Sequence, residues 1–337
     1  MGKIANIFFN STTLVYLVVI LFFCVFANPI LSLMGLDTDI HLDHTNVAPS
    51  WSGTYLLGSD HLGRDVFAML LNGTKFSIAI SLYSALLASI IGVIVGILSG
   101  FYGDTKLKAS RSNLIVLLVL FPFVVHYLNL SQKLEAGSGT VLMVLSIIVF
   151  FLIWKLLNLF LKKIPALKKT LFIPVDFINM KWIEILFAIP TYFLLLALSG
   201  VFSPSVHSLI IIIGITSWPK TALLTRSEML KIRDLDFMHS LKLSGIPWYQ
   251  ILWKHAIPNA TSPAIVDFVF FASALLVIES TLSFIGIGLP GEIISWGKVL
   301  TGFKYNSSSW WTALFPGMAI LLTILSFHRV GKMVKKQ

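Results

Sequence analysis

The stretch DFMHSLKLSGIPWYQILWKHAIPN, residues Asp236–Asn259, is a polar, mildly basic interruption between two long apolar runs. Residues 237–243 predict one short amphipathic helix, which Gly245 is expected to break. Pro247 fits the first position of a second short helix, because its missing N–H would have no partner there. Pro258 is expected to end that helix, since the residue before a proline avoids helical geometry. The pattern indicates a docking unit at a membrane surface, with an ordinary interhelical loop as the alternative.

The composition is that of a protein with many membrane spans. Of the 337 residues, 56% are hydrophobic and 12% are charged, and the mean hydropathy is +0.88. These values are typical of membrane proteins and exclude an ordinary soluble domain. The single cysteine, Cys24, excludes an intramolecular disulfide and a cysteine-cluster metal site.

Hydropathy predicts an all-α polytopic fold with about eight spanning helices. In chain order they are Leu14–Leu33, Phe76–Leu98, Leu114–Leu130, Val141–Leu161, Trp182–Phe202, Ser208–Leu224, Pro263–Ile287 and Trp311–Phe327. A signal peptide is the alternative for the first run, but the run is long and no A-x-A-like site follows, which favours an uncleaved span.

Three glycines in the second predicted span share one helix face. Gly92, Gly96 and Gly100 recur at four-residue spacing. Small residues in this register predict that a neighbouring helix approaches closely, with general glycine enrichment in membrane helices as the alternative.

The basic residues predict the orientation of the chain. If the N-terminus is cytoplasmic and the spans alternate, most of the 25 Lys and Arg residues fall on the cytoplasmic side. The positive-inside rule then places both termini and residues 236–259 in the cytoplasm of a cell (inner) membrane protein. The net charge of +10 is thereby explained without nucleic acid, which would need a basic face on a soluble domain.

Several motifs in fixed order resemble those of ABC-importer permeases. Residues 236–259 resemble the EAA loop of these permeases, with Gly245 at its glycine, Ile257-Pro258 at its L-P, and His239-Ser240-Leu241 in place of E-A-A. The other motifs match the second permease subunit of the dipeptide, oligopeptide and nickel branch. They are LGSDHLGRD (57–65), FYG (101–103), WP with Arg226 (218–226), HAIPN (255–259), ESTLSFIGIG (279–288), SWG (295–297) and WTALFPG (311–317).

The resemblance implies a six-helix permease core plus about two inserted transmembrane helices, because about 70 residues separate motifs that adjoin in the family. The implied organisation runs from an N-terminal helix to a basic tail. It comprises the helix 1–36, an external loop 37–74 with the GSDHLGRD motif, a core helix 75–103, the insertion 104–174, the core 175–330 with a cytoplasmic coupling loop 226–261, and the tail 331–337. The insertion is expected to pack at the periphery, or alternatively to bind a partner subunit or lipid.

The resemblance further implies a subunit that moves di- or oligopeptides by alternating access. The expected partners are a homologous permease, two ABC ATPase subunits, an extracytoplasmic substrate-binding protein and membrane lipid. The chain has no G-x-x-x-x-G-K-[ST] sequence, so ATP and Mg are expected on the partners and no cofactor on this chain. The candidate ATPase-coupling residues are Phe237, Met238, His239, Ser240, Leu241, Lys242, Gly245, Trp248, Tyr249 and Pro258, with Leu252 as a further apolar anchor and Asp236, Lys242 and Lys254 as a polar rim.

Glu279 is the one clear ionisable residue that this reading places within a span, so a partner is expected for its carboxylate. A structural hydrogen bond is one interpretation. A proton relay in a secondary transporter that works alone is the other. Arg64 and Asp65 are expected to brace their loop or to form a gate.

No catalytic or metal-binding residues are assigned. No nucleophile-elbow pattern occurs, so hydrolase chemistry is not expected. His41, His44 and His61 lie in an Asp-rich loop without a recognisable ligand pattern. A nickel or metal-chelate cargo remains the alternative to a peptide.

Overall fold

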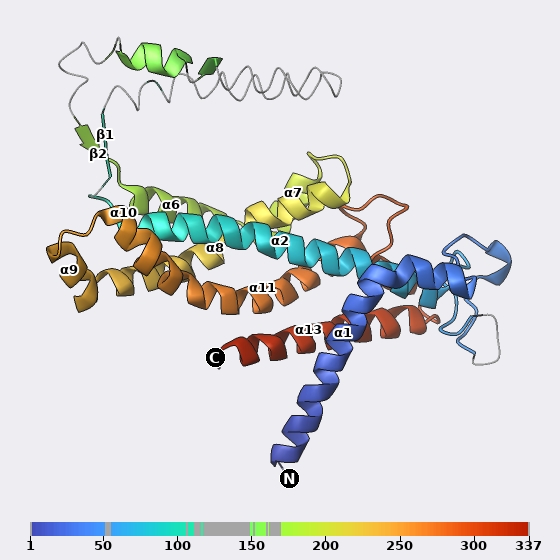
Figure 1. Ribbon diagram of the computed structural model, residues 1–337. Coiled ribbons are helices and arrows are strands. Elements are labelled where there is room, and N and C mark those ends of the chain that lie inside the picture. Colours follow the sequence, from blue (N-terminus) through green and yellow to red (C-terminus); the bar gives the residue numbers. More distant parts are fainter. Residues whose placement is uncertain are drawn as a thin grey trace. The chain divides into compact units, whose positions relative to one another are not determined.

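The computed structural model describes residues 2–50, 55–105, 107–110, 116, 149–150, 152–159, 161 and 170–335. This part of the chain is mostly helical and contains one two-stranded sheet (Figure 1). The predicted all-α class is confirmed. The chain divides into two compact units, of which unit 1 comprises residues 1–101 and 181–337, and unit 2 comprises residues 102–180.

The helices of the described part follow the predicted order. Their bounds are α1 Gly2–Met34, α2 Val66–Tyr102, α6 Val175–Ala188, α7 Thr191–Ser199, α8 Val206–Arg233, α9 Asp236–Leu243, α10 Trp248–Gln250, α11 Ile257–Ile285, α12 Trp296–Tyr305 and α13 Trp311–Lys335. A 3₁₀ turn covers Leu42–His44, and a π-helical turn covers Ile251–Ala256.

Four helices in the described part are long and apolar enough to cross a membrane. They are α2, α8, the continuous helix Trp248–Ile285, and α13. Three of them contain a predicted span whole, and the fourth, Trp248–Ile285, ends two residues before the predicted span 263–287 does. α1 contains the predicted run 14–33, of which Val18–Ala27 counts as a shorter apolar helix.

The predicted span Trp182–Phe202 is broken in its middle. It falls on α6 and α7, whose axes bend by 88°, as in a broken span or a re-entrant loop. Pro190 lies at the break with a ψ of 127°, outside the helical region. Its ring removes a backbone donor and disfavours helical geometry at Ile189, so the helix ends there.

Unit 2 is closed at its ends by a short antiparallel sheet. Strand β1 (Lys108–Ser110) pairs with β2 (Thr170–Phe172), with Ala109 opposite Leu171. The Asp104 carboxylate accepts a hydrogen bond of 2.9 Å from the Phe177 N–H. The two ends of the predicted insertion 104–174 therefore lie side by side. The predicted span 114–130 lies outside the described residues apart from Val116, and the span 141–161 is described only in part.

The core of unit 1 lies where α2, α7, α8, α11 and α13 meet. The largest cluster includes Ile80, Leu195, Leu209, Leu275 and Phe327, one from each helix. Lipid is as apolar as these faces, so the contacts between the spans are stabilised by close van der Waals packing and not by removal from water.

α1 is held to the same unit by polar contacts with two other helices. The Tyr16 hydroxyl donates to the Ala319 carbonyl in α13 over 3.1 Å. The Cys24 thiol donates to the Thr74 carbonyl in α2 over 3.5 Å. The first predicted span thus packs as an integral helix of unit 1.

The glycine spacing in α2 has the predicted consequence. A Cβ on Gly92 would lie 2.7 Å from Thr221 Cβ, and one on Gly96 would lie 2.6 Å from the Ala222 carbonyl oxygen of α8. A Cβ on Gly100 would lie 2.6 Å from Met229 Cβ. Close approach of a neighbouring helix is therefore confirmed, and the neighbour is α8.

The substitution Gly96→Val is expected to destabilise unit 1 by about 1–3 kcal/mol, because it forces α2 away from the α8 backbone. Gly317→Val in α13 is the matched control, since a Cβ there would meet nothing within 4 Å. Thermal unfolding in detergent measures both. Equal loss of Tm in the two variants would show that α2 and α8 do not depend on close packing.

Candidate functional site

The connection between α8 and α11, residues 234–256, is called here the connecting segment. It contains α9, a turn, α10 and the π-helical turn. The predicted helix 237–243 is confirmed as α9, and Gly245 ends it with a φ of +71°, which side chains other than glycine rarely adopt. Pro247 was predicted as the first residue of the second helix. It is the N-cap residue instead, and α10 begins at Trp248.

The prediction that Pro258 ends the second helix is wrong, because the chain continues through Pro258 into α11. In an α-helix a proline clashes with the carbonyl four residues earlier and lacks a donor. Here the preceding turn is π-helical, with the Ile257 N–H donating to the Leu252 carbonyl, five residues back. This wider turn lets the helix pass the proline without ending.

One side of the connecting segment is built into unit 1. The Met238 side chain is fully buried, and Leu252 is 8% exposed. Both belong to an apolar cluster that joins the segment to α2 and α8, whose other members are Ile97, Met229, Ile232, Ile251, Ala256 and Ala260. Met238 and Leu252 therefore support the segment from within and present no surface to a partner in this conformation.

The other side of the segment exposes large apolar side chains. Phe237 is 41% exposed, Trp248 58% and Tyr249 50%. Sequence reasoning missed others, of which Leu243 at 89% and Trp253 at 70% are the most exposed. The signal for them was present, because both are apolar residues in a polar stretch. Exposed apolar groups of this size are typical of a protein-binding surface.

The remaining predicted coupling residues fall on or beside these elements. Leu241 is half-buried against the apolar cluster, while His239 and Ser240 are exposed on α9. Lys242 lies in α9, Gly245 in the turn, and Pro258 in the first turn of α11. α9 and α10 lie at the same end of unit 1 (Figure 1), so the structure brings most of the set together.

Glu279 is fully buried in α11 and is surrounded by serine hydroxyls. Ser283 donates to its carboxylate over 2.8 Å and Ser280 over 3.3 Å. Ser77 of α2 and Ser295, which caps α12, lie beside the same carboxylate. Glu279 thus lies where α2, α11 and the start of α12 meet.

The same two distant serines also accept backbone donors. The Trp296 N–H donates to the Ser77 hydroxyl over 3.0 Å, and the Lys298 N–H donates to the Ser295 hydroxyl over 3.4 Å. Because each of these hydroxyls accepts from the backbone, its own O–H can still point toward Glu279. The Ser280 and Ser283 hydroxyls donate to the carboxylate from its own helix, which favours a structural role over a proton relay.

Arg64 and Asp65 do not pair with each other. The Arg64 guanidinium contacts the Asp60 carboxylate over 2.6 Å instead. Asp65 precedes α2 and accepts from the Phe67 N–H over 2.7 Å, an N-cap arrangement. Burial raises the pKa of the Asp65 carboxyl above its ordinary value. Both residues thus make contacts within the loop that precedes α2.

The three histidines of this loop have separate partners. His41 contacts Asp37 over 3.1 Å, His44 lies against Tyr55, and His61 stacks on Tyr305 with the ring centroids 4.2 Å apart. Burial lowers the pKa of His61. In the described part of the loop these side chains do not converge on one point, so they form no cluster that suits a metal ion.

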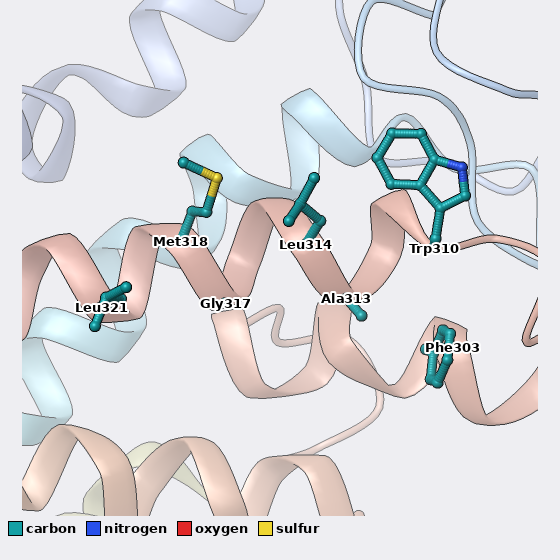
Figure 2. Close-up of a pocket in the computed structure, with 7 residues that line it drawn as sticks. All are labelled: Phe303, Trp310, Ala313, Leu314, Gly317, Met318 and Leu321. Carbon is teal, nitrogen blue, oxygen red and sulfur yellow. The ribbon is translucent and has the colours of Figure 1, made fainter.

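An apolar groove runs over α12 and α13 and encloses about 520 Å³. Figure 2 shows its lining: Phe303, Trp310, Ala313, Leu314, Gly317, Met318 and Leu321. These side chains offer no charged group to a polar cargo. The groove therefore suits an apolar neighbour better than a peptide.

Sequence reasoning also missed an ion pair between two spans. Lys220 of α8 contacts Asp267 of α11 over 3.5 Å. Glu279 is therefore not the one ionisable residue within the spans. The signal was legible, since both residues lie in runs that hydropathy assigns to the membrane.

Glu279→Ala is expected to destabilise unit 1 by about 2–4 kcal/mol, because it leaves the buried Ser280 and Ser283 hydroxyls without their acceptor. Ser273→Ala is the control, since that hydroxyl is 2% exposed and donates only within α11, to the Phe270 carbonyl. Glu279→Gln keeps an acceptor and should lose less. Chemical denaturation of the purified chain measures all three, and an equal loss for Glu279→Ala and Ser273→Ala would contradict the structural role.

Comparison with known proteins places this geometry in a family. Residues 171–337, about half of the chain, match the family described as binding-protein-dependent transport system inner membrane component. This range includes the connecting segment and Glu279, but not α1 or α2.

Three similar proteins cover most of the chain. A putative peptide transport system permease protein of Brucella suis biovar 1 is 25% identical over 278 residues, which are 82% of this chain and 70% of the relative. A putative peptide permease protein of Brucella ovis is 23% identical over 98% of this chain and 88% of its own length. The dipeptide transport system permease protein DppC of Alkalihalophilus pseudofirmus is 22% identical over 83% and 70%. The motif order, the helical fold and these matches agree, and the chain belongs to the family of inner-membrane components of binding-protein-dependent transport systems.

Proposed function

We propose that this permease moves di- or oligopeptides across the cytoplasmic membrane as a subunit of an ATP-driven ABC importer. The names of the three relatives, which refer to peptide or dipeptide transport, support the cargo class. The motifs of residues 57–65 and 279–288 support the same branch of the family. A nickel or metal-chelate cargo gains no support from the scattered histidines of the loop 37–65.

The observation that carries the proposal is the two-sided construction of the connecting segment. Its inner side is anchored by Met238 in the cluster shared with α2 and α8. Its outer side exposes Phe237, Trp248 and Tyr249. A partner that binds the outer side therefore holds a unit that moves with the spans.

Helix continuity directs such a movement into the membrane. α9 follows α8 after a turn at 234–235, and α10 runs without interruption through the π-helical turn into α11. A push on the segment displaces the ends of two spanning helices together. Rigid helices that rock in this way are a common route to alternating access.

The energy in this proposal comes from partner subunits. Two ABC ATPases that bind ATP and Mg would contact the connecting segment, and a homologous permease would complete the membrane part. A substrate-binding protein would deliver cargo on the other side, and lipid would surround the spans. The chain itself carries no Walker-A sequence for ATP.

The proposed orientation places both termini and the connecting segment in the cytoplasm. The helix ends agree with it, because the last turn of α8 contains Lys231 and Arg233, and the last turn of α13 contains Lys332 and Lys335. Basic residues beside spans favour the cytoplasmic side.

The double substitution Phe237→Asp and Trp248→Asp is expected to release the ATPases, because it puts two charges on the apolar contact surface. The homologous permease should stay bound, since the spans are unchanged. Purification from the native membrane in mild detergent, followed by identification of the co-purified chains by mass, measures both.

Tyr305→Asp is the matched control. Tyr305 is 70% exposed in α12 and stacks on His61, near the end of α2 opposite to the connecting segment. Retention of the ATPases by the double variant, or their equal loss from the Tyr305→Asp control, would refute the coupling surface.

A further inference from the structure

Lys220 and Asp267 form an ion pair between two spanning helices. Lys220 lies 13 residues before the end of α8, and Asp267 lies 10 residues after the start of α11. At a helix rise of about 1.5 Å per residue, the pair lies roughly 15–20 Å from the ends of these helices at the connecting segment. Both residues also fall inside the runs 208–224 and 263–287 that hydropathy assigns to the membrane, near the end of each run that faces the connecting segment.

The rest of the described chain satisfies these charges poorly. The Lys220 side chain is 58% exposed and that of Asp267 is 21% exposed, and their contact measures 3.5 Å. The second carboxylate oxygen of Asp267 is buried and has no hydrogen-bond partner among the described residues. A carboxylate normally accepts several hydrogen bonds, so this one needs a further donor.

The Lys220 ammonium also lies against an aromatic ring of α11. It lies 5.5 Å from the centroid of the Phe271 ring, one turn further into α11 than Asp267. A lysine that faced lipid would extend its ammonium toward the nearest membrane surface. The two contacts instead hold this ammonium beside α11, at the level of the pair itself.

Charges within a membrane face water, a cavity or a partner group, because exposure to lipid is costly. We propose that Lys220 and Asp267 face the aqueous path through which the cargo crosses, and that they offer it a paired cation and anion. The inference rests on the proposed function of the chain as a permease and deepens it. A peptide with a free ammonium and a free carboxylate is a cargo whose charges match such a pair.

Two prolines place the pair where the helices deform most easily. Pro219 directly precedes Lys220 within α8, and Pro263 lies one turn before Asp267 within α11. Each proline removes a helical hydrogen bond, to the carbonyls of Ile215 and Asn259 respectively, and such sites allow helices to bend. Since both helices join the connecting segment, a movement of the segment would change the spacing of the two charges.

The test measures how fast a water-soluble thiol reagent labels cysteines placed at positions 220 and 267. Lys220→Cys and Asp267→Cys are made in a Cys24→Ser background, which contains no other thiol. The importer, purified with its partners and placed in lipid vesicles, is exposed to a charged, membrane-impermeant methanethiosulfonate. Ile265→Cys is the matched control, because Ile265 is 63% exposed on α11 and lies about 200° around the helix from Asp267.

Labelling at 220 and 267 is expected to be at least tenfold faster than at 265, because thiols in water ionise and react while thiols in lipid do not. Rates at 220 and 267 as slow as at 265 would overturn the inference. Co-purification of the partners with each variant shows that it is assembled. The labelling needs no cargo, so a failure to transport peptides would overturn the proposed cargo class without touching this result.

Discussion

The close packing of α2 on α8 is the constraint on which the rest of unit 1 depends. Gly100 lets Met229 approach the α2 backbone, and the Arg233 guanidinium donates to the Gly100 carbonyl over 3.2 Å. The end of α8 is thereby fixed beside the end of α2. Met229 also belongs to the cluster that receives Met238. The position of the connecting segment therefore follows from the absence of side chains on one face of α2.

The two ends of α2 are held by different physical means. At the end near the connecting segment most contacts are apolar, apart from the Arg233 hydrogen bond, and apolar contacts tolerate small sliding movements. At the other end Trp296 of α12 makes two directed hydrogen bonds to α2: its backbone N–H donates to the Ser77 hydroxyl over 3.0 Å, and its indole donates to the Leu70 carbonyl over 3.1 Å. Directed bonds fix geometry more strictly than apolar packing does. This difference suits a subunit that is moved from one end.

Hydropathy and glycine spacing were sufficient to predict the helical class, four of the spans and the close approach of some helix to the glycine face of α2, because each depends on local pattern. That this helix is α8 came only from the structure. The kink at Pro190 and the helix through Pro258 show the limit. The same residue type ends one helix and lies inside another, and the difference is a π-helical turn that no local pattern announces. The partners of Arg64 and Glu279, and the pairing of Lys220 with Asp267, depend on residues far apart in the chain. Packing also decides which of the predicted coupling residues face outward. Phe237 and Met238 are adjacent and both apolar, yet Phe237 is exposed and Met238 is buried.

The most direct test of the account is peptide uptake into vesicles that contain the purified importer and its substrate-binding protein. ATP is supplied on the side of the connecting segment, and in a parallel sample a proton gradient is supplied instead. The account predicts uptake that requires ATP and that the proton gradient alone does not support. Uptake driven by the proton gradient without ATP would contradict it and would make Glu279 the residue to study as a proton carrier.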